Sequence, residues 1–262
     1  MDMPADSVTR PPALGRPDRA LFAEALALAW SDFRAAPRFG LAVSGVYVVL
    51  GWLIAWITVA SGTTYWLVLA AMGFPLIAPF AAVALYDVSR RMDLRQPLTW
   101  RAVLAETLAQ RTGQLPVLGA AMVILFLFWF FLGHMIFALF LGLSPMTNVS
   151  TGLDVYLTAN GLGMLAFGTL VGGVFALVLF STSVMALPML LDRDIDVITA
   201  MIASAGYVRR HPVPMLGWGL MIAGLTVLAI VPGFLGLLVV LPLLGHASWH
   251  LYALAVVRAR QE

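Results

Sequence analysis

The chain has 262 residues, of which 61% are hydrophobic and 11% are charged, and its formal net charge at pH 7 is +2. Soluble domains are about 45–50% apolar and about 25% charged, so this composition excludes an ordinary soluble protein and indicates an integral membrane protein. The absence of cysteine excludes disulfide bonds, thiolate metal sites and cysteine nucleophiles.

The first twenty residues form a polar, proline-rich segment without an apolar run. A secretory signal peptide requires such a run, so we expect none here. We predict a disordered cytoplasmic tail over residues 1–20, followed by a single membrane domain with six helices over residues 21–262.

Six apolar segments are each long enough to cross a membrane. A hydrocarbon core of about 30 Å needs about 20 apolar residues in helical form, and backbone groups in lipid must find their partners within the helix. We therefore expect an all-α integral membrane protein. Its six predicted spans are Gly40–Ser61, Thr64–Ser89, Leu115–Leu141, Gly161–Leu191, Val213–Val231 and Gly233–Val257.

The fifteen basic residues are all arginines, and they alternate between the connections of these spans. Five precede the first span, five lie between the second and third, three lie between the fourth and fifth, and two follow the sixth. This is the positive-inside pattern, which places both termini in the cytoplasm. We expect the arginines to contact the lipid bilayer, and we expect no nucleic-acid partner.

Three amphipathic segments precede the first, third and fifth spans: Leu21–Ala35, Leu98–Arg111 and Ile195–Arg209. Apolar residues three and four apart, with charges on the other face, predict helices at the membrane interface. The predicted apolar faces are Leu21, Ala25, Leu28 and Phe33 in the first, Trp100, Val103, Leu104 and Leu108 in the second, and Ile198, Ile202 and Tyr207 in the third.

Each amphipathic segment is followed by two spans, which suggests a threefold repeat of one amphipathic helix and two spans. Prolines in similar surroundings support it: Pro75, Pro188 and Pro242 each lie in the second span of a unit. A proline frees a backbone carbonyl in a membrane helix. The resulting kinks either shape the bundle or line a polar cavity, as in transporters.

Charged residues are scarce within the spans. Asp87 lies one turn from Arg90 and Arg91, and we expect it to pair with them. Asp192 and Asp194, together with Asp196, form a charged junction after the fourth span. Acids there favour the start of the next helix. A cation site is the alternative, although the spacing matches no calcium loop.

The histidines are the other candidate functional residues. His246 and His250 are four apart and share one helix face, while His134 belongs to the third span. Two imidazoles alone do not complete a metal site, and the depths of His134 and His246 differ by about 10 Å, which disfavours a shared haem. We expect hydrogen bonds between helices here and no cofactor; a metal, a haem and a polar cavity are the alternatives.

Gly168 and Gly172 form a small-xxx-small motif, which suits close helix contact. The aromatic run over residues 126–131 favours lipid exposure or the groove of a partner. The sequence carries no phosphate-binding loop, nucleophile elbow or zinc-protease motif, so we expect no enzymatic activity.

Several stretches resemble an uncharacterised family of bacterial six-span inner-membrane proteins: Ala29–Pro37, Gly73–Phe80, Tyr86–Arg91, Leu187–Asp194 and Leu241–Tyr252. Members of this family are often labelled components of cytochrome c oxidase, without an established activity. The resemblance implies a bacterial inner membrane and a respiratory neighbourhood. The chain lacks an evident set of haem–copper histidines, so a catalytic oxidase subunit is not expected.

The sequence thus favours a non-catalytic inner-membrane protein that is an accessory or assembly component of a membrane complex, or that forms a homo-oligomer. The alternative hypothesis is a transporter or channel for a small solute, which would use the proline-broken helices together with His246 and His250.

Overall fold

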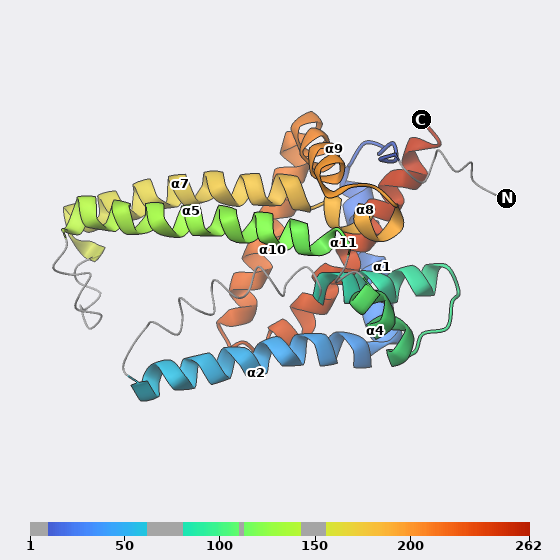
Figure 1. The fold of residues 1–262 in the computed structure, drawn as a ribbon, viewed down its shortest axis with the longest axis horizontal. Coiled ribbons are helices and arrows are strands. Elements are labelled where there is room, and N and C mark those ends of the chain that lie inside the picture. Colours follow the sequence, from blue (N-terminus) through green and yellow to red (C-terminus); the bar gives the residue numbers. More distant parts are fainter. Residues whose placement is uncertain (1–9, 62–80, 110–112, 143–155) are drawn as a thin grey trace.

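The computed structural model describes residues 10–61, 81–109, 113–142 and 156–262, and all regular structure within them is helical (Figure 1). Residues 81–93 form one helical segment. The other helices are α1 (Arg19–Ala35), α2 (Pro37–Ser61), α4 (Trp100–Ala109), α5 (Leu115–Leu141), α7 (Ala159–Ser183), α8 (Ala186–Asp192), α9 (Val197–Arg210), α10 (Pro212–Ile230) and α11 (Leu237–Ala259).

Five of the six predicted spans are confirmed as long apolar helices: α2, α5, α7 continued by α8, α10 and α11. Large apolar side chains cover their outer faces, and Val59, Leu139 and Val213 are 74–83% exposed, as expected for helices that face lipid. Most of the other predicted span, residues 64–80, lies outside the described residues, and its last residues, 81–89, are helical.

The three amphipathic segments are confirmed as helices α1, α4 and α9. Two of them begin with an aspartate cap: Asp18 accepts a hydrogen bond from the N–H of Leu21 at 2.8 Å, and Asp196 accepts one from the N–H of Thr199 at 2.9 Å. Such caps satisfy N–H groups that the first helical turn leaves free.

The predicted apolar faces of these helices are only partly buried against the rest of the protein. Leu28, Ile198 and Ile202 are exposed, and so are Trp100, Leu104 and Leu108 of α4. Small residues such as Ala29 and Ala200 are buried instead. Small side chains permit close packing on the bundle, where Leu21, Phe33 and Tyr207 are buried as well, while the exposed large apolar side chains point away from it.

Each amphipathic helix packs on another helical element. Helix α1 lies along α11, and α9 packs on α7 and α8 (Figure 1). Helix α4 contacts the helical segment 81–93, where Val103 packs against Val88. In addition, α5 pairs with α7, and α2 and α10 each pack on α11. Helix α11 is therefore the central element of the described structure.

The junctions α1–α2 and α9–α10 have nearly the same geometry. Ala36 has φ −135° and ψ 54°, and His211 has φ −129° and ψ 57°. Each donates its backbone N–H to the carbonyl four residues earlier, and each precedes the proline that starts the next helix. Proline fits this first helical position because the N–H that it lacks would have no helical partner.

The N-terminal segment differs from the expected tail. Residues 1–9 lie outside the described residues, but α1 already begins at Arg19, and residues 14–18 pack against the ends of α9 and α11. Figure 1 shows this dark blue segment beside the red end of α11. The described ends of the chain therefore lie on the same side of the bundle.

Candidate functional site

A largely buried polar cluster surrounds residues 246–252 in the middle of α11, and we call it the hub. Four side chains of this helix reach three other elements, namely α1, the segment 81–93 and α8. The α11 residues of the hub are His246, Trp249, His250 and Tyr252, and their partners are Ser89, Asp93, Asp32 and Asp192.

His250 connects two elements that lie far apart in the sequence. Its Nε2 donates to Oδ2 of Asp32 in α1 at 2.7 Å, and its Nδ1 lies 3.9 Å from Oδ2 of Asp93. His250 and Asp32 are buried, whereas the Asp93 side chain is 43% exposed. The same Asp93 oxygen accepts the indole N–H of Trp249 at 2.9 Å. A buried carboxylate needs such partners, because its desolvation is costly.

His246 lies one helical turn before His250 in α11 and is fully buried. Its Nδ1 is 2.8 Å from the hydroxyl of Ser89, which is also fully buried. Its Nε2 makes no hydrogen bond within the described part of the chain. Both histidines of α11 thus form the expected hydrogen bonds between helices, and Nε2 of His246 has no hydrogen-bond partner among the described residues.

The three aspartates of the charged junction after the fourth span have different surroundings. Asp192 accepts the hydroxyl of Tyr252 at 2.7 Å and pairs with Nε of Arg193 at 3.1 Å. Asp196 caps α9, and hydrogen bonds from Thr199 lower its pKa below the usual range for aspartate. Asp194 is exposed. Among the described residues, no three His, Asp or Glu side chains are placed to hold a metal ion together.

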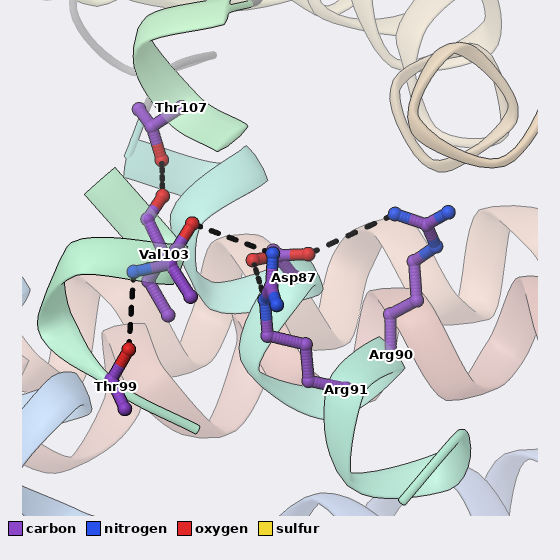
Figure 2. A network of polar contacts seen from close by, with 7 residues as sticks. Asp87, Arg90, Arg91, Thr99, Val103 and Thr107 are labelled. Atoms are coloured by element: carbon purple, nitrogen blue, oxygen red, sulfur yellow. Dashed lines mark hydrogen bonds and ion pairs between the residues drawn. The ribbon is translucent and has the colours of Figure 1, made fainter. Parts of the chain in front are cut away.

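Asp87 pairs with Arg90 and Arg91, as predicted (Figure 2). The fully buried carboxylate lies 2.5 Å from Nε of Arg91 and 3.8 Å from Nη1 of Arg90. Arg91 also donates to the carbonyl of Ala102 in α4 at 3.4 Å. The ion pair thus holds Arg91 in place, and the hydrogen bond of Arg91 to Ala102 links the segment 81–93 to α4.

The remaining predicted site residues lie outside the hub. His134 is exposed on α5 and bonds the carbonyl of Phe130 in its own helix at 2.8 Å. Gly168 and Gly172 face α5, where a Cβ atom on Gly172 would lie 3.0 Å from the Trp129 ring and one on Gly168 would lie 4.0 Å from Ile136. The small-xxx-small motif therefore packs two helices of the same chain.

Serine hydroxyls lie close to backbone N–H and carbonyl groups that lack helical partners near prolines. The break between α7 and α8 lies just before Pro188, and there Ser204 of α9 donates to the carbonyl of Ser181 at 2.7 Å and accepts the N–H of Met185 at 3.1 Å. Near Pro242, the hydroxyl of Ser44 in α2 donates to the carbonyl of Gly40 at 2.7 Å and also lies 3.4 Å from the carbonyl of Leu238, which the proline leaves without its helical donor.

We expect Ser204→Ala to destabilise the protein, because it leaves the Met185 N–H and the Ser181 carbonyl without the hydroxyl that joins them. An unsatisfied buried group costs about 1–3 kcal/mol. The free energy of unfolding in mild detergent measures this. The matched control is Ser183→Ala, whose hydroxyl bonds only the carbonyl of Leu179 in its own helix. Equal effects of the two substitutions would show that the Ser204 bridge contributes nothing.

Sequence reasoning missed five members of the hub: Asp32, Ser89, Asp93, Trp249 and Tyr252. A usable signal was present, since five side chains with N–H or O–H groups fall within seven residues of one largely apolar helix, at positions 246–252. Polar groups in a membrane helix need partners on neighbouring helices, so acids at the ends of other segments were the natural candidates.

Comparison with known proteins agrees with a membrane protein. A family model described as "Predicted integral membrane protein (DUF2189)" matches residues 67–192. The match includes α4, α5, α7 and α8 but ends before α11. No curated protein and no solved structure matches the chain. Together with the five apolar helices, the match identifies the chain as a multi-span integral membrane protein.

Proposed function

We propose that this chain is a non-catalytic bacterial inner-membrane protein and serves as an accessory or assembly component of a membrane complex in a respiratory neighbourhood. The observation that carries the proposal is the hub itself. Its acids Asp32, Asp93 and Asp192 all bind donors of α11, so they hold elements of the same chain together.

The proline breaks support the same role. A transporter that used broken helices would present their free backbone groups to a solute. Here the hydroxyls of Ser204 and Ser44 approach those groups. The outer face of α5 carries Phe128 and Phe131, which are 67% and 68% exposed and offer a contact surface to lipid or to a helix of the complex.

The positions of the described ends support six spans with both termini on one side of the membrane, and the arginine distribution favours the cytoplasm as that side. Gly15 bonds Ala255, and Asp18 bonds Arg258, so the two ends of the chain meet on one side. Ends on the same side of a membrane require an even number of crossings. The five apolar helices account for five crossings, so one more is needed. Residues 64–80 are the apolar segment available for it.

The packing order also supports the threefold repeat. Each amphipathic helix contacts the second span of the preceding unit: α4 contacts segment 81–93, α9 contacts α7 and α8, and α1 closes the ring on α11. The matching α1–α2 and α9–α10 junctions favour the same interpretation.

A small-solute transporter or channel is the second candidate. It is favoured by Nε2 of His246, a buried polar atom that makes no hydrogen bond among the described residues. In such a protein, this nitrogen would contact the solute.

We expect affinity purification of the tagged chain in gentle detergent to recover a stoichiometric membrane partner, identified by mass spectrometry. We also expect His246→Leu to retain that partner, because the His246 side chain is fully buried and lies away from the proposed contact surface on α5. Absence of a partner, combined with solute flux in liposomes that His246→Leu abolishes in a folded protein, would establish the transporter instead.

A further inference from the structure

Residues 14–18 lie in an extended segment across the ends of α9 and α11, and we call this segment the latch. Both backbone groups of Gly15 are used: its N–H donates to the carbonyl of Ala255 at 2.8 Å, and its carbonyl accepts the hydroxyl of Tyr207 at 2.9 Å. Contacts that run through the main chain do not depend on most side chains of the bound segment. They are typical of peptide recognition.

Close packing restricts one position of the latch. Gly15 is buried, and a Cβ atom there would lie 2.8 Å from the backbone nitrogen of Ala259 and from the side chain of Arg258. Pro17 is buried as well, and Leu14 packs against the main core. The groove therefore accepts an apolar residue, then glycine, and a second buried residue two positions later.

Arg258 provides the charged contact of the groove. Its Nη1 donates to the carbonyl of Arg16 at 3.0 Å and pairs with Asp18 at 2.9 Å. The N–H of Leu21 and then this arginine lower the pKa of Asp18. A cavity of about 560 Å³, lined by the latch, Arg258 and the last two residues, opens beside these contacts. Water thus reaches one side of the latch.

The latch precedes α1 and belongs to none of the membrane helices. Its C-terminal end joins α1 directly at Arg19, and its contacts with α9 and α11 are a few hydrogen bonds, one exposed ion pair and the packing of Leu14, Gly15 and Pro17. Exposed ion pairs contribute about 0–1 kcal/mol each. The arrangement is therefore that of a segment bound in cis to a preformed groove.

We propose that the groove formed by Tyr207, Ala255 and Arg258 is a docking site for an extended segment of a partner protein, and that the latch occupies it until such a segment arrives. The chemistry of the groove specifies that segment: an apolar residue, a glycine, and an acidic residue three positions after the glycine. The setting of this partner rests on the proposed accessory role, whereas binding of a peptide to the groove does not.

The test uses the full-length protein in nanodiscs and a fluorescent peptide with the sequence of residues 10–18. In the Gly15→Val chain, the bulky side chain keeps the latch out, so the peptide is expected to bind saturably in trans. The wild-type latch competes at an effective concentration of order 1 mM, so the peptide should bind the wild type at least about tenfold more weakly. Gly15→Ala is a milder second variant for the case that valine impairs folding.

Matched controls separate specific docking from adhesion. A peptide carrying valine in place of its glycine should not bind, and adding Tyr207→Phe to the Gly15→Val chain should weaken binding of the original peptide. Equal binding to the wild type and to both glycine variants, or no binding to either variant, would overturn the proposal. If light scattering shows that the wild type dimerises and that Gly15→Val abolishes the dimer, the occupant is the latch of a second copy and not a partner. If affinity purification recovers a membrane partner but the peptide binds neither glycine variant, the docking site is refuted and the proposed accessory role is not.

Discussion

Replacing His250 with leucine is expected to lower the free energy of unfolding by about 3–5 kcal/mol, because Asp32 would remain buried without its imidazole partner. The Nε2–Oδ2 contact is 2.7 Å, and His250 and Asp32 are 2% and 7% exposed. Since Asp32 belongs to α1 and His250 to α11, the loss should appear first as separation of α1 from the bundle. Unfolding of the purified variant in mild detergent and hydrogen exchange of α1 measure the two effects.

A double-mutant cycle isolates the contact itself. The double variant His250→Leu with Asp32→Leu removes both polar groups, and apolar replacement of a buried pair is often close to neutral. We therefore expect the double variant to be more stable than either single variant. Purely additive effects would contradict a direct interaction. Asp93→Asn is a useful comparison, since its amide oxygen can still accept the Trp249 N–H and its side chain is partly exposed.

The described spans could be predicted because the bilayer leaves few alternatives. Long apolar runs must be helical in lipid, so α2, α5, α10 and α11 were found within a few residues of their ends. The break between α7 and α8 was less accessible. The sequence shows Pro188, but only the structure shows that the helix ends at Ser183 and that Ser204 enters the gap.

The amphipathic helices show where periodicity fails. Period and charge located α1, α4 and α9 correctly, but a hydrophobic pattern does not distinguish a face that meets protein from one that meets lipid. In α9, Ile202 is 68% exposed while Ala200 and Ser204 are fully buried. In a membrane, small residues mark helix contacts, because lipid is as apolar as a large side chain.

The sequence predicted three of the eight hub residues, namely His246, His250 and Asp192. The spacing of His246 and His250 placed both on one face of α11, which is correct. Their partners depend on tertiary packing: Asp32 is 218 residues from His250, and Ser89 is 157 residues from His246. The latch was missed for a related reason. Its proline-rich composition resembles that of a tail, and its order comes from contacts with α9 and α11.

Replacing Gly40 with valine is expected to lower the free energy of unfolding about as much as the loss of His250. The reason is that α2 and α11 touch at Gly40 without room for a side chain. A Cβ atom on Gly40 of α2 would lie 2.7 Å from Cβ and 2.9 Å from Cγ of Pro242 in α11, and 3.2 Å from the Phe33 ring. Proline is rigid, so it cannot move aside as a flexible side chain would. Overpacking a core costs about 1–3 kcal/mol and occasionally more.

A second loss should follow from the first. If α2 moves away from α11, the carbonyl of Leu238, which lacks its helical donor because of Pro242, also loses the hydroxyl of Ser44 that lies 3.4 Å away and donates mainly to the carbonyl of Gly40. We therefore expect a total loss of about 3 kcal/mol or more, measured as the free energy of unfolding in detergent. Gly45→Val is the matched control: it lies on the same helix, and a Cβ atom there would meet nothing within 4 Å. Similar stability of the two variants would mean that α2 does not approach α11 this closely at Pro242.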